Sequence, residues 1–273
     1  MLEEVRRGLR RRARLARFRA LDSADFLLGR RDPLVPPRRY VDGVGGFDFA
    51  QVGRHLAAIA IEHGQLAPTE RILDIGCGVG RLAVPLTSYL TSGEYVGFDI
   101  SRPAIDWCLR AIAEHHPRFW FRFVDVANSH YNPRGRILPE AFRFPCADGS
   151  VDVAFAASIF THLVPAAAEQ YLGEAARTLK IGGRGVFSFF LLDPEVRLRL
   201  KTLGPRFEHF IETFCAVADR DDPEAAIAYD VEVVTSALER HGLEVLSVAR
   251  GSWAGFSRSV SFQDFVFVRR VAG

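Results

Sequence analysis

The chain has 273 residues, of which 48% are hydrophobic and 25% charged, close to the average of folded globular proteins. This composition excludes a disordered or collagen-like chain, and no apolar run reaches the roughly 18 residues needed to span a bilayer. The four cysteines form no C-x-x-C pair, and the Arg-rich start lacks the apolar stretch of a secretory signal. We therefore expect reduced thiols, no bound metal and a soluble protein that stays in the cytoplasm.

Positive charge is concentrated at the start of the chain. Residues 1–40 hold twelve arginines and five acidic residues, a balance of +7, whereas the other 23 basic and 28 acidic residues give −5. Apolar residues recur at helical spacing over the first twenty positions, which predicts an amphipathic, Arg-rich helix within an N-terminal extension, residues 1–48. Either this helix packs on its own domain with a solvated basic face, or it contacts an acidic membrane, nucleic acid or substrate.

Prolines separate this helix from the rest of the chain. Pro33, Pro36 and Pro37 end the helical pattern, because proline lacks an amide proton and restricts the residue before it. In the main domain, residues 49–273, short apolar runs alternate with helical segments, which is typical of a parallel sheet with crossover helices. Strands are predicted near 71–75, 94–99, 119–125, 151–157 and 184–192, with helices at 81–90, 102–114 and 165–179.

The last part of the domain contains a predicted substrate lid. Residues 193–230 are charged and irregular in pattern, and they precede a helix that reaches His241 and two strands near 243–248 and 262–268. The loop between these strands is too short for a helical crossover, so the pair should form an antiparallel hairpin. The fold class is therefore α/β, a doubly wound, Rossmann-like sheet of seven mostly parallel strands that ends in an antiparallel C-terminal hairpin.

Three alternating glycines, Gly76, Gly78 and Gly80, follow the first predicted strand. Glycine lets the backbone turn tightly and approach a ligand, but such a turn also serves dinucleotide enzymes. Asp74 changes the interpretation, because a carboxylate beside the turn repels a pyrophosphate. A ligand that carries an ammonium and a sulfonium is attracted instead. The motif therefore favours a cationic amino-acid ligand.

Two more acidic residues end the next two strands. Asp99 lies nineteen residues after Gly80, where a carboxylate can accept hydrogen bonds from both ribose hydroxyls, and Ile100 can lie against adenine. Asp125 ends the third strand, where it can accept a hydrogen bond from an adenine amino group. Three acidic residues that end three successive strands predict the edge of a ligand crevice.

These residues resemble the class I S-adenosylmethionine-dependent methyltransferase family over about residues 67–192. Residues 144–153 are similar to the family's segment that leads into the fourth strand. Residues 179–183 are similar to the family's turn before the fifth strand, where Ile181 replaces the usual proline. Residues 158–163 and 251–253 are similar to bacterial small-molecule methyltransferases. The resemblance implies S-adenosylmethionine as cofactor, with its amino-acid end at Asp74, Gly76, Cys77 and Gly78, its ribose at Asp99 and its adenine at Asp125 and Val126.

Two polar residues, Ser158 and His162, follow the fourth strand, at the edge where open α/β sheets bind ligands. Ser158 is a candidate cofactor contact. His162 is a candidate general base for an acceptor hydroxyl, or else a residue that caps or supports the helix that Pro165 begins. The chain departs from the family between Asp125 and Phe144, where residues 129–135 are inserted.

The sequence after the fourth strand lacks a motif that DNA methyltransferases carry. Residues 157–160 are not the Asn or Asp, Pro, Pro, aromatic tetrapeptide expected of DNA amino methyltransferases, so no DNA acceptor is expected. We expect a methyltransferase that acts on a hydroxyl or amine of a small molecule, lipid or glycan, aligned for in-line displacement in a water-poor pocket. A non-catalytic cofactor-binding module and a nicotinamide-dependent oxidoreductase are the alternatives.

Overall fold

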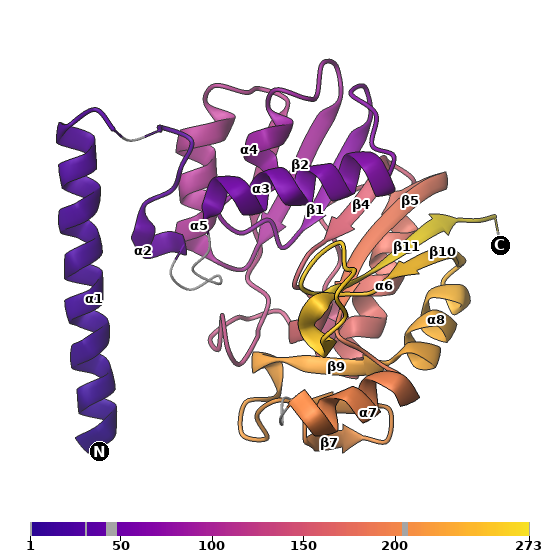
Figure 1. The fold of residues 1–273 in the computed structure, drawn as a ribbon. Helices are drawn as coiled ribbons and strands as arrows, with labels where there is room; N and C mark the ends of the chain where they lie inside the picture. The colour runs from indigo at the N-terminus through magenta and orange to yellow at the C-terminus, as the bar shows by residue number, and fades with distance from the viewer. Residues whose placement is uncertain (1, 31, 42–47, 204–206, 273) are drawn as a thin grey trace.

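The computed structural model describes residues 2–30, 32–41, 48–203 and 207–272. In this part of the chain, one seven-stranded sheet has the order β10-β11-β5-β4-β1-β2-β3 (Figure 1). Only β11 runs antiparallel to its neighbours β5 and β10, which confirms the predicted fold class and the C-terminal hairpin. The strands are β1 (Arg71–Ile75), β2 (Glu94–Asp99), β3 (Phe119–Phe123), β4 (Val151–Ala156), β5 (Leu179–Phe189), β10 (Leu243–Ala249) and β11 (Asp264–Arg270).

Helices cover both faces of this sheet, and the alternation of side chains along β1 divides the core between them. Ile72 packs with the helices of one face, and its neighbour Leu73 packs with those of the other. The first face carries α3 (Phe49–Ala58), η1 (Ile59–His63), α4 (Ala83–Leu86), α5 (Arg102–Cys108) and η2 (Leu109–Ala113). The second carries α6 (Pro165–Thr178) and α8 (Val231–Arg240).

Two elements next to the predicted ligand crevice are shorter than expected. The helix after the glycine turn was predicted over 81–90, but α4 has only four residues. Pro85 has no amide proton to donate to the carbonyl of Arg81, so regular helix cannot extend back to that residue. Strand β3 ends at Phe123, because the carbonyl of Asp125 accepts hydrogen bonds from residues 136 and 137 instead of continuing the ladder.

The predicted irregular lid, residues 193–230, is instead largely ordered into regular elements. A second, four-stranded sheet has the order β6-β9-β8-β7. It starts where β5 ends, so it lies at the carboxyl edge of the main sheet. Its strands have two to four residues, too few to show an alternating pattern. The elements are β6 (Leu191–Leu192), α7 (Pro194–Leu203), β7 (His209–Glu212), β8 (Cys215–Val217), η5 (Pro223–Ala225) and β9 (Ile227–Asp230).

The basic N-terminal segment forms α1 (Leu2–Leu27), which stands beside the rest of the molecule in Figure 1. It is joined to the short helix α2 (Arg38–Val41), where the guanidinium of Arg38 lies 3.1 Å from Asp22 and 2.7 Å from Asp25. The predicted N-terminal extension, residues 1–48, includes residues 42–47, which lie outside the described residues. The main domain resumes at α3, where the side chain of Asp48 caps the helix.

No helix in the described ranges is both long and apolar enough to cross a membrane.

Candidate functional site

The glycine turn follows β1 and is tied to the end of β2. Gly76, Gly78 and Gly80 have φ values of 74°, 52° and 80°, a conformation that side chains with a Cβ atom disfavour. The amides of Gly76 and Cys77 both donate to the carbonyl of Phe98, at 2.9 and 3.0 Å. These bonds fix the turn at the carboxyl edge of the sheet, between β1 and β2.

Two of the glycines in the turn face different surroundings. A Cβ atom on Gly76 would lie 1.9 Å from Cδ1 of Ile159, so the loop after β4 packs directly on the turn. A Cβ atom on Gly78 would meet nothing within 4 Å, so this backbone is open to a ligand. The side chain of Cys77 is buried, with Sγ near Gly97 of β2, which leaves its backbone as the part that can contact a ligand.

Asp74 is the acidic residue closest to the turn on β1. Only 4% of it is exposed, and the hydroxyl of Tyr95 on β2 donates a hydrogen bond to its carboxylate. Burial raises the pKa of Asp74 to about 7, although the Tyr95 bond opposes this shift. The carboxyl group is thus partly protonated at neutral pH, and a nearby ammonium would favour its ionised form.

Asp99 connects the end of β2 to the turn. Its Oδ2 atom accepts a 2.8 Å bond from the amide of Gly78, and Oδ1 accepts a 2.7 Å bond from the amide of Ser101. Burial raises the pKa of Asp99, and these backbone bonds oppose that shift. Each carboxylate oxygen keeps acceptor capacity for a ligand hydroxyl. Ile100, beside it, is half-buried against the core.

Asp125 lies just past β3 and is held by one residue of the insertion and by the residue that directly follows the insertion. Nε of Arg136 is 3.2 Å from its carboxylate, and Nδ2 of Asn132 is 3.3 Å away. Val126 is buried and pairs with Ile137 in a parallel bridge. The inserted residues therefore fold back over the predicted adenine contact.

Ser158 and Gln263 meet at the end of β4. Ser158 has a φ of 59°, which is strained for a residue with a Cβ atom. Its amide donates to Oγ of the buried Ser188 at 2.7 Å, and both hydroxyls donate to Oε1 of Gln263, at 3.0 and 2.7 Å. Ser188 of β5 and Gln263, just before β11, thus hold this strained residue at the carboxyl edge.

His162 lies in η4 (Phe160–His162) and is partly buried. Nδ1 is 2.9 Å from the carbonyl oxygen of Glu224, which can only accept, so Nδ1 carries the proton. Nε2 is then an acceptor, and it lies 3.4 Å from the hydroxyl of Tyr131. Burial lowers the pKa of His162, which keeps the ring neutral at pH 7.

The insertion after Asp125 contacts the connection between β8 and β9, which also contacts His162. Nδ1 of His130 is 2.6 Å from Asp222, and the hydroxyl of Ser129 is 3.1 Å from the same carboxylate. The amide of Ser129 donates to Glu224 at 2.5 Å. We call these contacts the latch.

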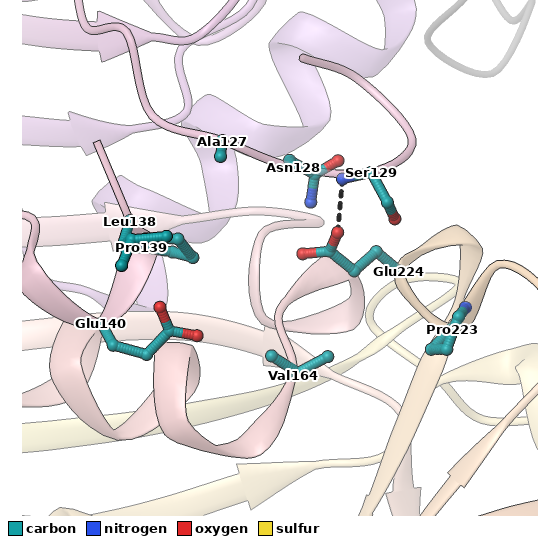
Figure 2. A pocket seen from close by; sticks show the side chains of 9 residues that line it. All are labelled: Ala127, Asn128, Ser129, Leu138, Pro139, Glu140, Val164, Pro223 and Glu224. Carbon is teal, nitrogen blue, oxygen red and sulfur yellow. Dashed lines mark hydrogen bonds between the residues drawn. The ribbon is translucent and has the colours of Figure 1, made fainter. Parts of the chain in front are cut away.

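The latch borders a cavity of about 290 Å³, shown in Figure 2. Asn128 and Glu224 line it, and both also bind His162, through the amide of Asn128 and the carbonyl of Glu224. The remaining lining residues are Ala127, Ser129, Leu138, Pro139, Glu140, Val164 and Pro223.

Comparison with known proteins identifies the domain that carries this site. A family described as a methyltransferase domain matches residues 72–183, which begin in β1, include the glycine turn, Asp99, Asp125 and His162, and end within β5. Residues 72–183 are therefore similar to a methyltransferase domain, and the chain shares the fold of S-adenosylmethionine-dependent methyltransferases. The methyl donor of this family is S-adenosylmethionine, as the glycine turn and its acidic neighbours led us to expect.

Individual relatives of this methyltransferase are distant. An uncharacterized methyltransferase of Schizosaccharomyces pombe is 28% identical over 116 residues, 42% of this chain and 38% of that protein. The match thus spans well under half of the curated relative.

Two solved structures share the fold with a TM-score of 0.55. One is a S-adenosylmethionine-dependent methyltransferase of Methanosarcina mazei, 20% identical, over 78% of this chain and 98% of that chain. The other is the 1,6-didemethyltoxoflavin-N1-methyltransferase of Burkholderia thailandensis, solved with 1,6-didemethyltoxoflavin and S-adenosylhomocysteine. It is 15% identical, over 94% of this chain and 90% of that chain.

Several residues of the methyltransferase site were not predicted from sequence. The insertion itself was visible, but its partners in the latch lie more than 90 positions away in the chain. Within the described residues, no group of three or more His, Cys, Asp or Glu side chains is arranged to hold a metal ion.

Proposed function

We propose that this chain transfers a methyl group from S-adenosylmethionine to a hydroxyl or amine of a small-molecule, lipid or glycan acceptor. The observation that carries the proposal is the set of carboxylates at or near the ends of three adjacent strands, Asp74, Asp99 and Asp125, beside a glycine turn with open space at Gly78. A buried carboxylate beside the turn disfavours pyrophosphate and favours the ammonium of the cofactor.

The residues present fit this cofactor. Asp99 has acceptor capacity for ribose hydroxyls, and Gly78 offers open backbone beside it. When bound, S-adenosylmethionine supplies an electrophilic methyl group. The cofactor contacts that we propose are Asp74, Gly76, Cys77, Gly78, Asp99, Ile100, Asp125, Val126 and Ser158.

His162 is our proposed general base. Its Nδ1 proton is committed to the Glu224 carbonyl, so Nε2 is available to take a proton from an acceptor. The hydroxyl of Tyr131 lies 3.4 Å from Nε2, so an acceptor hydroxyl would have to replace it beside this nitrogen. An imidazole kept neutral by burial is in the protonation state that a base requires.

The cavity at the latch supports a small acceptor. Its volume of about 290 Å³ is at the lower end of small-molecule sites. Apolar walls from Leu138, Val164 and the prolines are combined with polar groups of Asn128 and Glu224 (Figure 2). This combination suits a molecule with an apolar body and a few polar groups.

We also propose that α1 contacts an anionic surface. It is Arg-rich and joins the body through the ion pairs of Arg38 with Asp22 and Asp25 at its C-terminal end. Arginine side chains on a helix that stands beside the domain are suited to phosphate or carboxylate groups.

Titration calorimetry with S-adenosylhomocysteine and NAD tests the cofactor assignment. We expect micromolar binding of S-adenosylhomocysteine and none of NAD, and the reverse preference would overturn the proposal. Acceptors are then sought by measuring S-adenosylhomocysteine formation with hydroxylated and amine-bearing small molecules. A chain that binds the cofactor but methylates none of these, nor lipids or glycans, would be a cofactor-binding module.

A further inference from the structure

A half-buried glutamine, Gln263, joins two serines at the carboxyl edge of the main sheet. Its Oε1 atom accepts hydrogen bonds from the hydroxyls of Ser158 and Ser188, at 3.0 and 2.7 Å. Ser188 is completely buried, and its Oγ atom also accepts a bond from the amide of Ser158 at 2.7 Å. The three residues therefore form one closed hydrogen-bond network around Ser158.

The pairing of β5 with β11 brings Gln263 to Ser188. Ser188 lies opposite Phe265 in this antiparallel pair, so the two side chains point to the same face of the sheet. Phe265 packs on the face that α3 and α4 cover. Gln263 comes just before the first residue of β11, and its contact with Ser188 shows that it turns to the same face. Two strands that are distant from Ser158 in the chain thus supply its partners.

Ser158 needs such partners because its backbone conformation is unfavourable. Its φ of 59° lies in the left-handed region, which a residue with a Cβ atom enters only where the surrounding structure offsets the cost. Ser188 holds the amide of Ser158, and Gln263 holds its hydroxyl. The network is therefore placed to stabilise this conformation.

The conformation of Ser158 sets the direction of the chain that follows it. Ile159 lies so close to the glycine turn that a Cβ atom on Gly76 would be 1.9 Å from its Cδ1 atom. The carbonyl oxygen of Ile159 then accepts a 2.9 Å bond from the amide of His162, at the end of η4. A change of Ser158 to a negative φ would redirect both Ile159 and η4, and the glycine turn would lose the side chain that packs on it.

We propose that Gln263 is a positioning residue for cofactor binding. It holds Ser158 in the left-handed conformation, and Ser158 in turn keeps Ile159 packed on the glycine turn. This inference rests on the proposed function, because it takes the glycine turn as part of the S-adenosylmethionine site. Without Gln263, fewer molecules have the binding-competent loop, and the apparent affinity for the cofactor falls by the same factor.

Titration calorimetry with S-adenosylhomocysteine tests this role. Gln263→Met keeps the length of the side chain but has no acceptor oxygen, so it should weaken binding about 5- to 50-fold, as expected for the loss of two neutral hydrogen bonds. Gln263→Glu keeps an acceptor oxygen and should restore most of the affinity. The matched control is Gln170→Met, because Gln170 is also half-buried and donates a 2.9 Å bond to the carbonyl of Phe142. This control should leave the affinity unchanged.

Two substitutions of Ser158 separate the backbone strain from the loss of the hydroxyl. Ser158→Ala and Ser158→Gly both remove the hydroxyl, but only glycine adopts a positive φ without strain. Ser158→Ala should therefore bind S-adenosylhomocysteine at least about fivefold more weakly than Ser158→Gly. Adding Gln263→Met to Ser158→Gly should weaken binding by less than about twofold, because a glycine at this position does not need the support.

A merely structural glutamine would give other results. If Gln263→Met lowers the melting temperature but keeps the wild-type affinity, or if Gln263→Glu binds as weakly as Gln263→Met, the positioning role is wrong and the methyltransferase proposal stands. If Gln263→Met does not fold, equal affinities of the two Ser158 variants contradict the positioning role instead. A wild-type protein that does not bind S-adenosylhomocysteine would overturn the proposed function itself.

Discussion

The Oδ2 atom of Asp99 accepts a 2.8 Å hydrogen bond from the amide of Gly78. This bond joins the end of β2 to the most open part of the glycine turn, so the residue proposed to bind ribose also shapes the loop proposed to bind the amino-acid end. Loss of the carboxylate should therefore affect both parts of the cofactor site.

Asp99→Ala should weaken S-adenosylhomocysteine binding at least about tenfold, because each hydrogen bond to a charged group contributes roughly 1.5 to 3 kcal/mol. Asp99→Asn keeps one acceptor oxygen and should lose less. Calorimetry measures both. An alanine variant with wild-type affinity would show that Asp99 does not bind ribose.

Asp74 should make cofactor binding pH-dependent. Its pKa of about 7 means that the carboxylate needed by the cofactor ammonium is progressively protonated as the pH falls. Binding of S-adenosylhomocysteine should weaken several-fold from about pH 8 to pH 6, within the limit of about tenfold per pH unit for a single proton. In Asp74→Asn the affinity should be low and nearly constant over this range, and a pH-independent wild type would contradict the contact.

A rise in pH should strengthen cofactor binding through Asp74 but lower the contribution of Asp74 to the stability of the ligand-free fold. Its pKa in the folded chain lies above the ordinary 3.8, so the folded state binds this proton more tightly than the unfolded state. Its contribution to stability is therefore present at acid pH and declines as the pH rises from about 4 through 7. Ligand-free Asp74→Asn should gain melting temperature relative to wild type as the pH rises from about 5 to 8, whereas a constant difference would refute the shifted pKa.

His162→Ala should lower turnover by roughly 10² to 10⁴-fold with nearly unchanged S-adenosylhomocysteine affinity, if Nε2 is the base. The acidic limb of the wild-type rate profile should lie below pH 6.5, since burial lowers the pKa, and should vanish in the variant. Tyr131→Phe should change turnover far less, because the Glu224 carbonyl still fixes the tautomer. Joint loss of stability and cofactor affinity would indicate a structural histidine.

Breaking the latch should release the insertion. Asp222→Ala removes the contacts to His130 and Ser129, so hydrogen exchange at the amides of residues 129–135 should accelerate, and the KM for the acceptor should rise. The neighbouring exposed residue provides a matched control, Asp221→Ala. If the amides of residues 129–135 exchange at the wild-type rate in both variants, the latch does not hold the insertion.

Deletion of residues 1–30 should leave the domain folded, because the ion pairs of Arg38 connect α1 to α2 rather than to the sheet. The melting temperature should change little, and binding to vesicles that contain anionic lipids should be lost. A truncated chain that fails to fold would make α1 part of the core.

The sequence alone was sufficient to predict the main sheet of this protein. The parallel strands and the closing hairpin were predictable because buried strands have continuous apolar runs and short loops exclude crossovers. Asp74 and Asp99 could be placed at the ligand edge for the same reason, since each lies at or next to the end of a strand. The local sequence pattern was sufficient to place residues whose position follows directly from the end of a strand or from a turn.

Tertiary structure alone decided how the site is closed. The tautomer of His162 depends on a carbonyl 62 residues away, and the latch joins positions 92 to 95 residues apart. The second sheet was predicted to be irregular, because its strands are too short to show an alternation of apolar and polar residues. These strands form by pairing with one another, which a local sequence does not reveal.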